Sequence, residues 1–128
     1  MPSRPTPTKA ELAILRALWA LGQPSTVREI HEHLAVDKPA AYTTTLKMVQ
    51  IMTAKGLTIR EERGPQHLYR PHDPEDRMQR HLIEELCDRA FGGSTARLVI
   101  QALAGRRTSP EELDEIRKAI AAAKKTKE

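Results

Sequence analysis

The fold of this chain is decided by the stretch AYTTTLKMVQIMTA, residues 41–54. Apolar or small side chains recur there at positions i, i+3, i+4 and i+7, which predicts a helix with one face packed on a core. These positions are occupied by Thr45, Met48, Val49 and Met52. The opposite face is small, polar and basic, and it consists of Thr43, Thr44, Lys47 and Gln50. Because no Asp or Glu occurs between Lys38 and Arg60, this face is suited to approach phosphates and base edges.

Two shorter helices are predicted before this stretch, because residues 8–11 (TKAE) and 26–29 (TVRE) both have the spacing of a capping box. After it, residues 57–60 alternate between apolar and polar and can pair with residues 67–70 around a turn-rich tip at 61–66. The order of helix, helix, helix and hairpin is that of a helix-turn-helix with a wing. We therefore expect a flexible arm over residues 1–7 and a winged-helix domain over residues 8–72.

The remaining residues predict three further helices, which occupy 73–123 and are followed by a frayed basic tail over 124–128. Each helix has an apolar stripe, but about 45 residues are too few to bury these stripes among themselves. Two copies packed together would bury them, so we expect a homodimer. The residues predicted to form its interface are Met78, Leu82, Leu86, Leu98, Val99, Leu103, Leu113, Ile116 and Ile120. The predicted fold class is mainly α with a small β-hairpin, an N-terminal winged helix-turn-helix plus a C-terminal helical dimerisation domain.

Charge and composition narrow the class of function. The chain has 128 residues and a net charge of +4, and residues 38–70 hold six basic and two acidic side chains, which account for the whole excess. A positive charge confined to one segment is typical of a site for a polyanion. The chain has one cysteine, no hydrophobic signal region and no apolar run near the ~20 residues of a membrane span, which favours the cytoplasm.

Enzyme motifs are not found in the sequence, which has no Gly-rich phosphate loop, G-x-S-x-G or H-E-x-x-H. His31 and His33 are two positions apart on a predicted helix, so they point in nearly opposite directions and cannot share a metal ion. We therefore expect no catalysis, no metal and no cofactor.

Double-stranded DNA is the expected partner, and the residue types allow roles to be predicted. Thr43 and Thr44 have short side chains that suit base edges in the major groove, and Lys47 can reach a guanine or a phosphate. Tyr42 suits either packing on the core or a hydrogen bond to phosphate, and His67 lies near the wing tip. The remaining predicted phosphate contacts are Lys38, Lys55, Arg60 and Arg63.

Five short motifs together resemble the penicillinase-repressor family. They are AYTT at 41–44, KGL at 55–57, HLYRP at 67–71, FGGS at 91–94 and SPEEL at 109–113. Their order and spacing match over residues 8–122. The resemblance implies a repressor that binds a dyad operator through Thr43, Thr44 and Lys47, with the wing at residues 60–67. Ile51 and Ala54 stand where many members have basic residues.

The resemblance also implies how repression ends. A membrane sensor protease that detects a β-lactam would cause proteolysis in the dimerisation domain, at a bond that corresponds to Gln101–Ala102. The best-studied members have Asn-Phe at this bond. Two alternatives stay open from the residues alone: a winged-helix regulator that responds to a small ligand, and a winged-helix adaptor that binds an acidic protein instead of DNA.

Overall fold

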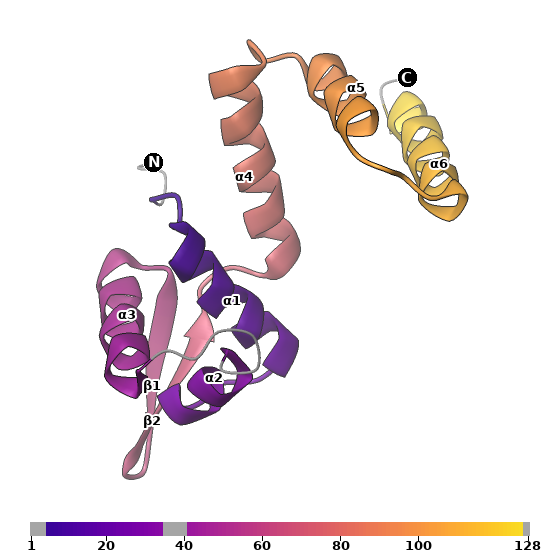
Figure 1. The fold of residues 1–128 in the computed structure, drawn as a ribbon. Helices are drawn as coiled ribbons and strands as arrows, with labels where there is room; N and C mark the ends of the chain where they lie inside the picture. The colour runs from indigo at the N-terminus through magenta and orange to yellow at the C-terminus, as the bar shows by residue number, and fades with distance from the viewer. Residues whose placement is uncertain (1–4, 35–40, 127–128) are drawn as a thin grey trace. The chain divides into compact units, whose positions relative to one another are not determined.

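The structure is a computed structural model that describes residues 5–34 and 41–126 (Figure 1). Predictions for residues 1–4, 35–40 and 127–128, including that for Lys38, lie outside the described residues. The chain divides into two compact units, Met1–Leu82 and Ile83–Glu128. Its elements in order are α1 (Lys9–Leu21), α2 (Val27–Leu34), α3 (Tyr42–Lys55), β1 (Thr58–Arg63), β2 (Gln66–Pro71), α4 (Glu75–Ala90), α5 (Thr95–Gly105) and α6 (Pro110–Thr126).

Both predicted capping boxes are confirmed. At the start of α1, the Glu11 amide donates to Thr8 Oγ1 at 3.2 Å and the Thr8 amide donates to Glu11 Oε1 at 2.8 Å. At the start of α2, Glu29 and Thr26 exchange the same two bonds at 3.1 and 2.8 Å. These bonds satisfy amide groups that have no partner inside the helix.

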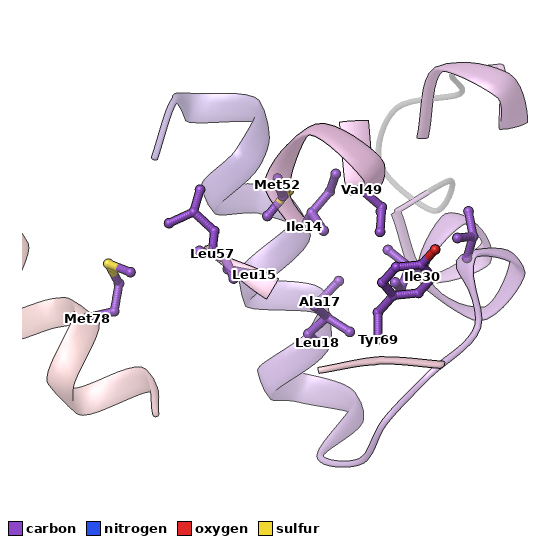
Figure 2. Packing of buried hydrophobic residues seen from close by; sticks show 11 residues of the cluster. Ile14, Leu15, Ala17, Leu18, Ile30, Val49, Met52, Leu57, Tyr69 and Met78 are labelled. Atoms are coloured by element: carbon purple, nitrogen blue, oxygen red, sulfur yellow. The ribbon is translucent and has the colours of Figure 1, made fainter. Parts of the chain in front are cut away.

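The core of the N-terminal unit is formed by α1, α2, α3 and the hairpin, with Leu57 between α3 and β1 (Figure 2). Its buried members are Ile14, Leu15, Ala17, Leu18, Val27, Ile30, Val49, Met52, Leu57, Tyr69 and Met78. Aliphatic side chains from three helices therefore supply most of the apolar burial that stabilises this unit. Three helices followed by a packed hairpin confirm the predicted winged helix-turn-helix.

The hairpin is longer than predicted. Strands β1 and β2 pair from Thr58 with Pro71 to Arg63 with Gln66, so the turn is only Gly64 and Pro65. Gly64 has a φ of 63°, a conformation that L side chains rarely adopt. The prediction placed residues 61–66 in the tip because a mostly exposed hairpin lacks the apolar alternation that marks a strand.

The N-terminal unit extends beyond the predicted boundary at residue 72. Met78 on α4 is only 3% exposed in the core of this unit, and Leu82 packs against the same cluster. The Trp19 indole N–H also donates to the Asp73 carbonyl at 3.0 Å. One copy of the chain therefore already buries the Met78 side chain, and its place in a dimer interface stays a prediction.

In the C-terminal unit, α5 and α6 are each capped by a serine: the amides of Arg97 and Glu112 donate to the hydroxyls of Ser94 and Ser109 at 3.1 Å. Neither α5 nor α6 has a buried residue. Large apolar side chains are exposed on all three elements of the unit, at Ile83, Leu86, Ile100, Leu103, Leu113 and Ile120. Of the other predicted interface residues, Leu98, Val99 and Ile116 are half-buried. Among the described helices, no stretch combines the length and apolar character of a membrane span.

Candidate nucleic-acid interface

Helix α3 has the two faces that its sequence predicts. Thr45, Val49 and Met52 are buried, and Val49 and Met52 lie in the core. The side chains of the opposite face are exposed: Thr43, Thr44, Lys47 and Gln50. Burial of one face fixes the helix on the unit, so its polar face is presented to solvent as a rigid surface.

The first turn of α3 has no negative charge. Its N-cap, Ala41, makes no side-chain capping bond, and the first turn has no acidic residue. The amides of Thr44 and Thr45 both donate to the Ala41 carbonyl, at 3.0 and 3.3 Å. No carboxylate of this first turn therefore offsets the positive end of the helix dipole, which favours an anionic partner near Thr43.

Tyr42, the first residue of α3, is held against α2. Its ring meets the His31 ring edge-on, with centroids 5.6 Å apart and planes at 83°. The Arg28 guanidinium carbon lies 5.1 Å from the centroid of the Tyr42 ring. His31 Nδ1 is 2.9 Å from Thr45 Oγ1. Tyr42 remains 37% exposed, so it contacts α2 without entering the core.

Lys55, at the end of α3, forms an ion pair that the sequence did not reveal. Its Nζ lies 2.8 Å from Oε2 of Glu11, whose side chain is 2% exposed. Burial alone would raise the pKa of Glu11. The hydrogen bonds from Lys55 and Thr8 have the larger combined effect, so the pKa of Glu11 lies below its ordinary value. The Lys55 ammonium is therefore engaged by a carboxylate inside the unit, although Lys55 was predicted to contact phosphate.

The hairpin pairs most of its cations with its own carboxylates. Arg60 Nη2 lies 3.3 Å from Glu62 Oε1, and His67 Nε2 lies 4.0 Å from the same oxygen. Arg70 is 3.9 Å from Glu61. Within the described part of the chain, Arg63 next to the turn has no carboxylate oxygen within 4.0 Å, and the same is true of Lys47. These two cations are thus the least compensated among the predicted contacts that the structure describes.

The predicted residues fall on two neighbouring elements. Tyr42, Thr43, Thr44, Lys47 and Lys55 lie along α3, while Arg60, Arg63 and His67 lie on the hairpin, next to α3 in Figure 1. Sequence reasoning missed Arg28 and His31 of α2. Arg28 and Tyr42 are fourteen positions apart in the sequence, and neither periodicity nor capping relates positions at that distance.

Comparison with known proteins agrees with this architecture. The sequence model of the family described as penicillinase repressor matches residues 7–122. Two curated relatives, each a transcriptional regulator BlaI from a strain of Mycobacterium tuberculosis, are 28% identical over 112 residues. The match spans 87% of this chain and 80% of each relative. A family match over nearly the whole chain, on a winged helix-turn-helix with a helical C-terminal unit, shows that this protein belongs to the penicillinase repressor family of transcriptional regulators.

Proposed function

We propose that the protein is a homodimeric transcriptional repressor that binds a dyad operator through α3 of each copy. The observation that carries this proposal is the exposed, acid-free face of α3, fixed to the unit by its buried opposite face. Phosphate contacts would supply most of the affinity and orient the helix in the major groove. Thr43 and Thr44 would then meet base edges, where a hydroxyl can donate or accept and a methyl can contact thymine.

Lys47→Ala is expected to weaken operator binding by about 1–3 kcal/mol, the range of one good base contact. Lys47 is exposed at the middle of the polar face and has no carboxylate partner among the described residues, so its removal should not disturb the fold. The measurement is a gel shift or fluorescence titration on the promoter of the protein's own gene. Arg77→Ala, which removes an exposed cation from α4, is the control and should leave affinity unchanged. Equal affinities for the Lys47 variant and the unmodified chain would remove Lys47 from the interface.

The exposed apolar side chains of the C-terminal unit support dimerisation. Three helices that expose six large apolar side chains in one copy need a partner surface, and a second copy of the same unit supplies a self-complementary one. A two-fold dimer would also link two α3 helices, one from each copy. Footprinting on the operator should accordingly show two protected half-sites separated by about 10 base pairs or a multiple of it.

Release from the operator would follow loss of the dimer. In the family's scheme, a membrane sensor protease cuts the dimerisation domain, and the corresponding bond here joins Gln101 and Ala102, both exposed on α5. Mass spectrometry of the chain from host cells exposed to a β-lactam should then find fragments 1–101 and 102–128. Recovery of only the intact chain from cells in which repression has ended would contradict this route and favour a ligand-operated release.

A further inference from the structure

We propose that Arg28 of α2 is a further phosphate contact of this interface, held in position by the ring of Tyr42. The inference rests on the proposed DNA binding and extends it to a helix that was not assigned a role. Arg28 is exposed, and its guanidinium lies 5.1 Å from the centre of the Tyr42 ring. That ring belongs to the first residue of α3, directly before Thr43 and Thr44.

The kind of contact that holds Arg28 matters for what it can bind. A carboxylate partner would occupy N–H donors of the guanidinium and offset its charge, as Glu62 does for Arg60, whose Nη2 donates to Glu62 Oε1 at 3.3 Å. An aromatic face attracts the cation without accepting its N–H donors in this way. Although α2 also contains Glu29 and Glu32, Arg28 has no carboxylate oxygen within 4.0 Å in the described part of the chain. Its charge and its planar set of donors thus remain available for a phosphate.

The ring itself is fixed by a chain of contacts that ends on a buried group. Tyr42 packs edge-on against His31, and His31 Nδ1 lies within hydrogen-bond distance of Thr45, which is 4% exposed. Arg28 and His31 both belong to α2, so these contacts set the position of the guanidinium relative to the first turn of α3. A cation held in this way has lost part of its side-chain freedom before binding, which reduces the entropic cost of ordering it on DNA.

The position of α2 agrees with a backbone contact. In a helix-turn-helix, the second helix enters the major groove while the first crosses the phosphate backbone beside it. With α3 as the second helix, α2 is the first, and Arg28 is its second residue. Arg28 would therefore neutralise a phosphate next to the groove that Thr43 and Thr44 enter. It would contribute to affinity for any duplex and not to the choice of sequence.

The test is the salt dependence of binding for full-length Arg28→Gln, measured on the operator and on a duplex of random sequence. Each neutralised phosphate makes the slope of log K against log salt more negative by about 0.9. Arg28→Gln should therefore make this slope shallower by about 0.9 per protomer on both duplexes. The two affinities should fall by the same factor, and the melting temperature should be unchanged. Arg77→Gln, which removes an exposed cation from α4, should leave the slope unchanged and serves as the charge-matched control.

Two further variants test the role of the ring. Tyr42→Leu removes the aromatic face and should weaken binding more than Tyr42→Phe, which retains it. If the two variants weaken binding equally, the ring does not position Arg28.

An unchanged salt slope for Arg28→Gln would overturn the inference. If the slope is unchanged and the melting temperature is lowered, Arg28 only joins α2 to α3. If the unmodified chain binds no duplex at low salt, the proposed function itself fails, which is a separate result from the failure of Arg28 alone.

Discussion

Lys55→Met is expected to lower the free energy of unfolding by about 2–3 kcal/mol, because it leaves the buried carboxylate of Glu11 without its ion-pair partner. Removing one member of a fully buried pair typically costs about 3–5 kcal/mol. Lys55 is 39% exposed, so water can partly replace its ammonium, and we expect the lower end of this range or slightly less. The loss should appear in urea unfolding at pH 7 as a lower midpoint with an unchanged slope.

A double-mutant cycle separates the pair from other effects of the substitution. Glu11 Oε2 accepts from Lys55, while Oε1 accepts from the Thr8 amide, so Glu11→Gln can keep the capping bond and lose the charge. Lys55→Met combined with Glu11→Gln should therefore be more stable than the sum of the two single effects predicts. Strict additivity would mean that the ion pair does not contribute to stability.

The same pair has a pH signature. The net pKa of Glu11 lies below its ordinary value of 4.5, since the bonds from Lys55 and Thr8 outweigh the effect of burial. A carboxyl group with a lowered pKa in the folded state stabilises the fold above the pKa of the unfolded chain, and this contribution disappears as the pH falls through the folded value. The unmodified chain should therefore lose more stability below pH 4.5 than Glu11→Gln does. Parallel stability profiles of the two proteins would contradict this assignment.

Local patterns in the sequence were enough to predict the helices and the exposed polar face of α3. The bonds of Thr8 with Glu11 and of Thr26 with Glu29 join residues three apart, so they follow from spacing alone. The polar face of α3 follows in the same way, because a helical period of 3.6 assigns each position to a side. For such features the sequence contains both partners within one helical turn.

The features that the sequence did not reveal depend on residues far apart along the chain. Glu11 was interpreted only as part of a capping box and Lys55 only as a free cation, yet 44 positions separate them and the packing of α1 on α3 brings them together. Met78 was placed with the C-terminal stripes because its spacing from Leu82 and Leu86 is helical. Periodicity tells which face of a helix is apolar, but not which surface covers each turn of that face.

The largest effect on operator binding is expected from the C-terminal unit. Leu103→Glu and Ile120→Glu, singly and combined, should convert a dimer into a monomer of 14.4 kDa. These side chains are 36% and 51% exposed in one copy, so the substitutions should not destabilise the folded monomer. A carboxylate buried between two copies without a partner is strongly unfavourable, so the same substitutions should destabilise the dimer. Thr95→Glu, which adds the same charge at an exposed position of α5, is the control and should remain dimeric.

Operator affinity should follow the state of assembly, because two linked half-site contacts act on one DNA molecule. Linked binding typically strengthens affinity by about 100-fold or more, so the unmodified chain should bind the full dyad at least that much more tightly than a single half-site. The Leu103→Glu/Ile120→Glu variant should lose this difference while its affinity for the half-site stays the same, because α3 and the hairpin are untouched. Analytical ultracentrifugation and titrations with both duplexes measure the two quantities on the same preparations. Two results would contradict this account: sedimentation of the unmodified chain as a monomer at micromolar concentration, and a preference for the dyad that persists in the monomeric variant. Either result would show that the exposed apolar side chains of α4, α5 and α6 do not serve to pair two DNA-binding units.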